Sequence, residues 1–364
     1  MNPARPLAHV ERVAWLRLAR TPGLGPLTFA RLIGRFGDAR AALEALPRLG
    51  RLTPLAAAVA EAELDGCDRI GARLIAACEP AFPHLLAALD PPPPVVSIRG
   101  DLSVLDRPTV ALVGARDASA AGLAMAGALA RDIGAAGATI VSGLARGVDA
   151  EVHRASLATG TVAVLAGGVD QPYPPQNLAL YDAIAARGLI VSEMPLGHRA
   201  RAKDFPRRNH LISGLSLAVV VVEAAERSGS LITARAAAEQ GREVMAVPGS
   251  PLDPRARGAN ALLKEGAVLV ESANDVFAAL GAAPRGPRPP RATPLLEPAA
   301  PSDRSLAGRL AALVSPTPVH LNVLARLLQA PIGAVAAALT ELEIEGRATS
   351  LPGGYAASSP PSGE

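Results

Sequence analysis

The run TVALVGAR, residues 109 to 116, decides the fold, because an uninterrupted apolar strand pattern ends there in a glycine turn and an Ala-rich helical stretch follows from about Ser119. Continuous apolar strands that alternate with helices are typical of a parallel sheet covered on both faces. The sequence therefore predicts an α/β fold with a doubly wound, Rossmann-like domain over residues 81 to 282. Six further runs repeat the pattern: ATIVSG (138 to 143), TVAVLAGG (161 to 168), LIVSE (189 to 193), LAVVVVE (217 to 223), REVMAVPG (242 to 249) and AVLVE (267 to 271).

Residues 1 to 80 carry helical rather than strand periodicity. Four short helices are expected, in VERVAWLRLAR, LTFARLIGRF, AALEAL and DRIGARLIAAC, and the prolines at 91 to 94 end this region. Between the first two lies TPGLGP (21 to 26), a Gly-x-Gly turn that leads into a helix. Such a turn resembles a helix-hairpin-helix or SAM-like element, whose amides can hold a DNA phosphate. A glycine turn between packed helices explains the same residues.

A second change of composition follows the Rossmann-like region. Residues 283 to 302 contain seven prolines in twenty and are expected to form a linker. Residues 303 to 357 combine three helical stretches with a hairpin, which is the pattern of a winged helix, and we expect residues 358 to 364 to be a disordered tail. The third helix carries Glu341, Glu343 and Glu345 and no base, so it is poorly suited to the DNA major groove.

Composition bounds the class of protein. The 364 residues suit two or three domains, and 49% hydrophobic with 19% charged residues does not fit a wholly disordered chain. The two cysteines, Cys67 and Cys78, have no CxxC or histidine cluster beside them, so neither a disulfide framework nor a zinc site is expected. No window holds eighteen uninterrupted apolar residues. We expect a cytoplasmic protein with no membrane contact, no metal and no cofactor.

Ligands of open parallel sheets bind beyond the carboxyl ends of the strands. The first strand end offers Gly114 and Arg116, and the second offers Gly143 and Arg146 ahead of a helix, with Asp149 expected to accept from turn amides rather than to catalyse. The third, GGVDQPYPPQN (167 to 177), is a rigid loop able to form the wall of a pocket. The fifth is predicted to be an anion site at a helix start, with Ser228, Gly229, Ser230 and Thr233.

The fourth strand end leads into a basic stretch. Residues 199 to 208 hold Arg199, Arg201, Lys203, Arg207 and Arg208 against Asp204 alone, and we expect this charge to lie on one loop. A phenylalanine flanked by cations, Phe205, is suited to stacking a base while its neighbours neutralise phosphates. A solvated loop with Phe205 packed in the core fits the sequence equally well.

Several spaced motifs together resemble the DNA-processing protein A family (DprA, also called Smf). They are SGLARGVDAEVHRASL, AGGVDQPYPPQN, SEMPLG, FPRRNHLISGLS, VVEAAERSGSLITARAAAEQGREVMAVPGS and GANALLKEGA, spread over roughly residues 80 to 282. The resemblance implies a non-catalytic protein that binds single-stranded DNA, forms a homodimer through its Rossmann-like domain, and loads the RecA recombinase onto incoming DNA during natural transformation.

The resemblance also assigns site residues. The family's Gly-x-Arg loop falls on Gly114 and Arg116, and its basic Phe-Pro-x-Arg-Asn segment falls on Lys203, Phe205, Arg208 and Asn209. With the strand-end residues, the expected DNA-binding set is Gly114, Arg116, Gly143, Arg146, Arg201, Lys203, Phe205, Arg207, Arg208, Asn209, Ser228, Gly229, Ser230 and Thr233. One departure is His210, where relatives commonly have Arg. Because histidine is mostly neutral near pH 7, we expect DNA contact there to be weaker or pH-sensitive.

Two enzyme classes are the alternatives. Rossmann-like enzymes that cleave nucleoside monophosphates place a Glu a few residues into the helix after a glycine-rich turn, whereas here the turn at 227 to 233 is followed by Ala-Arg-Ala-Ala-Ala. A dinucleotide-dependent oxidoreductase would need G-x-G-x-x-G, and residues 114 to 122 do not supply it.

Overall fold

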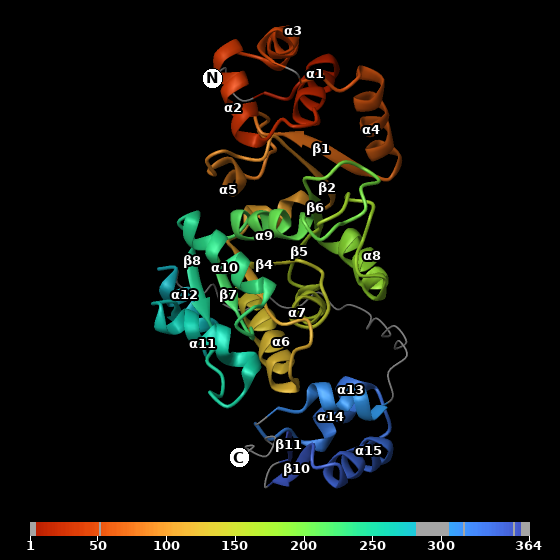
Figure 1. Ribbon diagram of the computed structural model, residues 1–364, viewed down its shortest axis with the longest axis vertical. Coiled ribbons are helices and arrows are strands. Elements are labelled where there is room, and N and C mark those ends of the chain that lie inside the picture. Colours follow the sequence, from red (N-terminus) through yellow and green to blue (C-terminus); the bar gives the residue numbers. More distant parts are fainter. Residues whose placement is uncertain (1–4, 51, 282–305, 316, 352–353, 358–364) are drawn as a thin grey trace.

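The computed structural model describes residues 5–50, 52–281, 306–315, 317–351 and 354–357. The predicted linker, 283 to 302, and the predicted tail, 358 to 364, lie outside the described residues. The N-terminal helices lie at one end of the molecule, the sheet with its covering helices lies in the middle, and the C-terminal helices lie at the other end (Figure 1).

The central sheet has nine strands in the order β1-β2-β6-β5-β4-β3-β7-β8-β9. All seven predicted strands are confirmed, and the pairs from β6 through to β9 are parallel. Two strands that the sequence analysis did not predict, β1 and β2, extend the sheet antiparallel beyond β6. The strands are β1 (Ala72–Ala76), β2 (Val95–Gly100), β3 (Thr109–Val113), β4 (Thr139–Ser142), β5 (Thr161–Val164), β6 (Leu189–Ser192), β7 (Ala218–Val221), β8 (Glu243–Ala246) and β9 (Val268–Leu269).

Helices bury both faces of the sheet. Successive residues of β3 alternate between two apolar clusters, with Val110 and Leu112 on one face and Ala111 and Val113 on the other. The first face packs against α6 (Ala120–Ala135), α7 (Val148–Ser156) and α12 (Ala273–Ala279), with α8 (Leu178–Arg187) beside α7. The second packs against α9 (Asp204–Gly214), α10 (Gly229–Glu239) and α11 (Arg257–Lys264). The predicted doubly wound α/β fold is therefore confirmed.

The N-terminal region contains α1 (His9–Ala19), α2 (Pro26–Phe36), α3 (Ala39–Leu49), α4 (Ala57–Arg69) and, after β1, the short α5 (His84–Ala87). The expected helix over DRIGARLIAAC (68 to 78) is wrong: α4 ends at Arg69, the second residue of this stretch, and residues 72–76 form β1. Gly71 has a φ of +68°, which ends the helical path after Ile70, and the next five residues pair with β2. A buried arginine joins this region to the sheet, because Arg20 pairs with Glu63 at 2.9 Å and donates to the carbonyl of Glu193 at 2.6 Å.

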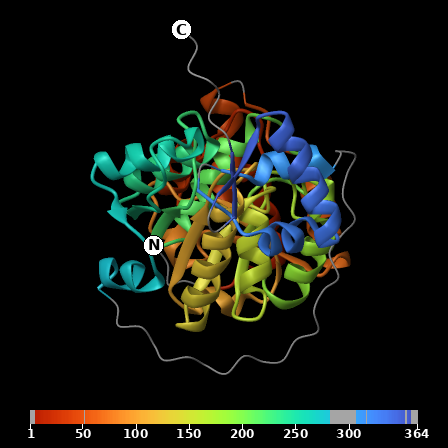
Figure 2. The same ribbon diagram turned by 90° about the horizontal axis from the view of Figure 1, so that it is seen from below.

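The C-terminal unit has the predicted winged-helix elements, α13 (Leu306–Leu313), α14 (Leu321–Leu328) and α15 (Ile332–Ile344), followed by the hairpin of β10 (Ala348–Leu351) and β11 (Gly354–Ala357). Figure 2 looks onto this end of the molecule. In the described part of the chain, no single helix has the length and apolar composition to cross a membrane, and α14 with α15 passes that test only as a pair bent by 109°.

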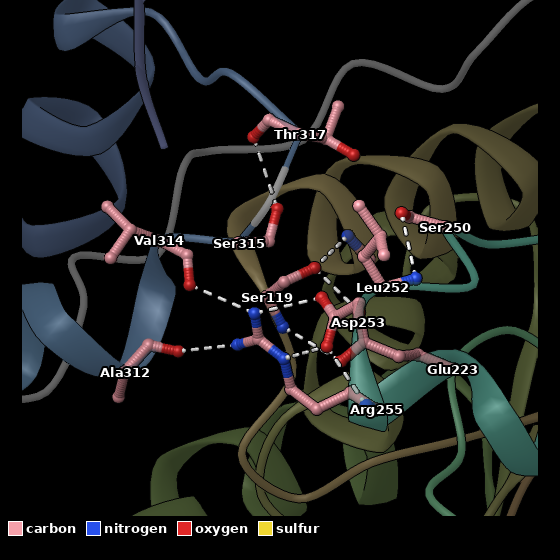
Figure 3. A network of polar contacts seen from close by, with 11 residues as sticks. Ser119, Glu223, Ser250, Leu252, Asp253, Arg255, Ala312, Val314, Ser315 and Thr317 are labelled. Carbon is pink, nitrogen blue, oxygen red and sulfur yellow. Dashed lines mark hydrogen bonds and ion pairs between the residues drawn. The ribbon is translucent and has the colours of Figure 1, made fainter. Parts of the chain in front are cut away.

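The winged-helix unit is held to the carboxyl edge of the sheet by Arg255, which follows β8 in the short helix η3 (Pro254–Ala256). Its guanidinium donates to the carbonyls of Ala312 at 3.0 Å and Val314 at 2.9 Å, and it pairs with Asp253 at 3.0 Å (Figure 3). A cation on the last carbonyls of a helix, here α13, is a favourable C-terminal cap. The first residue of α6, Ala120, is completely buried and packs with the apolar core of the winged-helix unit.

Candidate nucleic-acid interface

A cavity of about 320 Å³ opens at the carboxyl ends of β3, β4 and β5, beside the start of α9. Five of the residues predicted from sequence to bind DNA come together in its wall, although they are up to 92 positions apart in the chain. The predicted pocket wall of residues 167 to 177 is confirmed for its second half. The lining residues are Arg116, Gly143, Ala145, Arg146, Tyr173, Pro174, Pro175, Gln176, Phe205 and Arg208.

Arg208 forms the floor of the cavity and is only 6% exposed. Its Nη1 donates to the carbonyls of Gly143 and, at 3.2 Å, Val164, and its Nε donates to Oδ1 of Asn209 at 3.0 Å. None of the ion pairs that the described residues form includes Arg208. Burial lowers the pKa of this guanidinium, which nevertheless stays charged at pH 7. The buried carboxylate of Asp149 is close enough to act on this charge electrostatically but forms no ion pair with it. The guanidinium in the floor can therefore still bind an anion that enters the cavity.

The glycine turn after β4 fits tightly around that arginine. A Cβ added at Gly143 would lie 2.1 Å from Nη1 of Arg208, so a larger residue at this position would displace the guanidinium. The buried carboxylate of Asp149 accepts from the amides of Gly143 at 3.2 Å and Ala145 at 3.3 Å, and burial raises its pKa. The expectation that Asp149 serves turn amides is thereby confirmed.

Two guanidinium groups and a second aromatic ring all contact Phe205 in the wall of the cavity. The Arg116 guanidinium carbon lies 5.3 Å from the centroid of the Phe205 ring, and that of Arg208 lies 5.6 Å from it. Tyr173 meets Phe205 edge-on, with centroids 6.0 Å apart. Cations for phosphates and rings for bases are the two components of single-strand binding sites.

The basic stretch does not form one loop. Residues 204–208 begin helix α9, and the exposed Lys203 precedes its first residue. Asp204 accepts from the amide of Arg201 and from Nε2 of His198, both at 2.8 Å, which fixes the segment before the helix. The half-exposed Arg207 pairs with the buried carboxylate of Glu193, a partner that the sequence analysis missed.

The remaining predicted residues lie outside the cavity wall. Ser228, Gly229 and Ser230 cap α10, where the two serine hydroxyls are 2.7 Å apart, and Thr233 one turn later is 1% exposed. Asn209 joins this turn to α9, because its Nδ2 donates to the carbonyl of Gly229 at 3.2 Å. Gly114 is packed against Val148, and partial burial lowers the pKa of His210.

The sequence analysis also missed Tyr173, which is 54% exposed at the mouth of the cavity. The loop that carries it is pinned by the buried Asn177, whose Nδ2 donates to the carbonyls of Leu144 at 2.9 Å and Ala145 at 3.1 Å. The signal available in the sequence was an aromatic residue between prolines in a loop at a strand end.

A doubly wound domain with an arginine-floored cavity, placed between an N-terminal helical unit and a winged-helix unit, defines a class of modular Rossmann-like proteins. The chain belongs to the DNA recombination-mediator protein A family, whose model matches residues 73–281. Residues 9–65 match a DprA-like N-terminal HHH domain, and residues 293–354 match a DprA winged helix domain. The predicted family is therefore confirmed.

Similar proteins span several bacteria. Protein Smf of Synechocystis is 33% identical over 95% of this chain and 98% of its own length. DNA processing protein DprA of Bacillus subtilis is 42% identical over 54% of this chain and 67% of its own length. The structure of DprA from Streptococcus pneumoniae is 29% identical, with a TM-score of 0.64 over 75% of this chain and 98% of that one. A DprA structure from Helicobacter pylori, described for its single-stranded DNA binding mode, is 30% identical, with a TM-score of 0.52 over 55% of this chain and 92% of that one.

Proposed function

We propose that this protein binds single-stranded DNA in the cavity between Arg116 and Arg208 and acts, without catalysing a reaction, as a cytoplasmic mediator that loads RecA recombinase during natural transformation. The observation that carries the DNA assignment is the buried Arg208 guanidinium, which forms no ion pair within the described residues and lies at the floor of a cavity walled by rings. A phosphate in the cavity would bind the guanidinium groups of Arg208 and Arg116 through charge-assisted hydrogen bonds. The single-strand binding described for the Helicobacter pylori relative supports the same assignment.

The size of the cavity favours single strands over duplex DNA. About 320 Å³ accommodates roughly one nucleotide, and a base can enter it only when it is unpaired and unstacked. In a duplex both conditions cost free energy, whereas a single strand meets them at little cost.

The test compares a thymidine oligonucleotide with a duplex of equal length by fluorescence anisotropy. We expect at least tenfold tighter binding of the single strand and loss of this preference in Arg208→Leu. Arg131→Ala is the charge control, because Arg131 is exposed near the far end of α6. Equal affinities for both DNAs, or no binding, would refute the proposal. For the mediator role, RecA filament formation on a strand coated with single-strand binding protein should accelerate with the wild type and not with Arg208→Leu.

A homodimer through the Rossmann-like domain is part of this proposal, and residue exposure supports one candidate interface over another. Two apolar patches of this domain are candidate interfaces. The first, residues 234 to 238 of α10, is disfavoured because Ala234, Ala236 and Ala237 are buried in the core. The other, around β9, fits better: β9 is the last strand of the sheet and Leu269 on it is 47% exposed. Leu269→Glu should convert a dimer into a monomer in light scattering, and a wild-type monomer at micromolar concentration would contradict the dimer.

A further inference from the structure

Tyr173 is the aromatic residue whose ring is most open to a ligand. It is 54% exposed, whereas the other eight aromatic residues, all within the described part of the chain, are buried or partly buried. The residue also lines the cavity at its mouth. Since a nucleobase stacks only on a ring with an accessible face, Tyr173 meets the first requirement for base contact.

Phe205 has its ring engaged by other groups. Guanidinium carbons of Arg116 and Arg208 lie 5.3 and 5.6 Å from its centroid, within the range of cation–π attraction. Tyr173 contacts it at an interplanar angle of 70°. A base that stacks on Phe205 must therefore displace a favourable contact, whereas a base that stacks on Tyr173 leaves these contacts in place.

The two arginines differ in what they need from Phe205. Arg208 is fixed by carbonyl acceptors as well as by the ring, but among the described residues no hydrogen bond or ion pair of the Arg116 side chain accompanies its contact with Phe205. The contact with the Phe205 ring therefore helps to fix the position of the Arg116 guanidinium at the cavity.

We propose that Tyr173 is the residue that stacks a nucleobase of the bound strand, and that Phe205 is a positioning residue that holds Arg116 beside Arg208 for the adjoining phosphate. This inference rests on the proposed single-strand binding and divides that site between two moieties of one nucleotide. The base lies on Tyr173, and the phosphate lies on the two guanidinium groups.

Abasic DNA separates the two roles. A twelve-residue thymidine strand and a strand of equal length built from abasic sites have the same phosphates, so only the first can stack. Tyr173→Leu should weaken binding of the thymidine strand by about 5- to 100-fold and leave the abasic strand unchanged, because one stacked base is lost. Phe205→Leu should weaken both strands by the same factor, because it displaces a phosphate contact. Tyr173→Phe keeps the ring and should bind both strands like the wild type.

A spectroscopic measurement accompanies the affinities. A 2-aminopurine base in the strand should be quenched on binding to the wild type and to Tyr173→Phe, and not on binding to Tyr173→Leu. Equal affinities of Tyr173→Leu and the wild type for thymidine DNA, with normal quenching, would overturn the inference and leave the proposed function standing. A loss confined to the thymidine strand in Phe205→Leu would overturn it as well, by assigning the stacking to Phe205. Failure of the wild type to bind either strand would instead refute the proposed function.

Discussion

Glu223 closes the N-terminus of α6, because its carboxylate accepts hydrogen bonds from the backbone amide of Ser119 at 3.0 Å and from the Ser119 hydroxyl at 2.6 Å (Figure 3). The hydroxyl in turn accepts from the amide of Gly122 at 2.9 Å. In doubly wound proteins this helix N-terminus commonly binds a ligand phosphate. Here a carboxylate of the chain itself takes that place, and a Cβ at Gly122 would lie 2.6 Å from it.

Because Glu223 occupies the usual phosphate position, the candidate DNA site lies at a different place on the carboxyl edge of the sheet. The strand order reverses between β3 and β7, which is the usual ligand crevice, and Ser119 and Glu223 follow those two strands. The cavity is displaced toward β4 and β5. Gly114 and Gly122 therefore allow close packing rather than phosphate binding. A dinucleotide-dependent oxidoreductase would need this helix N-terminus for its pyrophosphate, and Glu223 already occupies it.

Ser119→Ala should lower the free energy of unfolding by about 2 kcal/mol, because it removes a helix cap and leaves a buried carboxylate short of a donor. Urea denaturation followed by circular dichroism measures the change. Ser350→Ala, at an exposed position of β10, is the matched control and should have almost no effect. A loss below about 0.5 kcal/mol in Ser119→Ala would show that Glu223 is satisfied without the hydroxyl.

Arg116→Ala and Lys203→Ala should each weaken single-strand binding for all base sequences alike and lower the slope of log K against log salt by about one unit, because each removes one phosphate contact. Titrations at several salt concentrations give the slope. Arg131→Ala should leave the slope unchanged. A wild-type slope in both Arg116→Ala and Lys203→Ala would rule out contact of these two residues with phosphates.

The sequence predicts the parallel strands well because they are continuous apolar runs, and every residue of β3 to β7 is buried. The antiparallel pair β1 and β2 escapes prediction, since ARLIA at 72 to 76 has the composition of a helix and becomes a strand only by pairing with residues 95 to 99. Tertiary pairing overrides local propensity there.

For the candidate DNA site, the sequence motifs predict which arginines are expected to bind DNA, but they do not predict which of these arginines form ion pairs within the protein. Arg208 is unpaired while Arg207, the next residue, pairs with Glu193, and no periodicity distinguishes the two. The Arg255 contact with the winged-helix unit spans 57 positions and uses backbone carbonyls, which leave no signature in the sequence. Tyr173 was missed because its exposure depends on how its loop is anchored by Asn177.

Arg255→Ala should release the winged-helix unit, because it removes both hydrogen bonds to the end of α13. Small-angle scattering of the full chain should then show a larger radius of gyration. Arg257→Ala is the matched control, since Arg257 is exposed two positions away and carries the same charge. Identical scattering of the two variants would show that contacts such as that of Ala120 hold the unit without the arginine.

His153 makes stability depend on pH. The side chain is fully buried on α7, its Nδ1 lies 2.7 Å from the Thr161 hydroxyl, and its Nε2 has no hydrogen-bond partner. Burial lowers the pKa of His153 to about 3, and the charges of Arg154 and Arg208 act in the same direction. In the unfolded chain the pKa returns to about 6.5.

Between these two pKa values the unfolded state binds one more proton than the folded state. Stability contributed by His153 is therefore fully present above pH 6.5 and is lost as the pH falls toward 3, at about 1.4 kcal/mol per pH unit near the middle of that window. Other buried groups titrate too, and Asp149, with its raised pKa, acts in the opposite direction.

The comparison that isolates His153 is therefore the difference between the wild type and His153→Leu, measured by urea denaturation at pH 7, 6 and 5. The variant should be less stable at pH 7, because packing and the Thr161 hydrogen bond are lost, yet its stability should decline less steeply toward pH 5. Parallel pH profiles for the two proteins would show that His153 takes up its proton equally in both states.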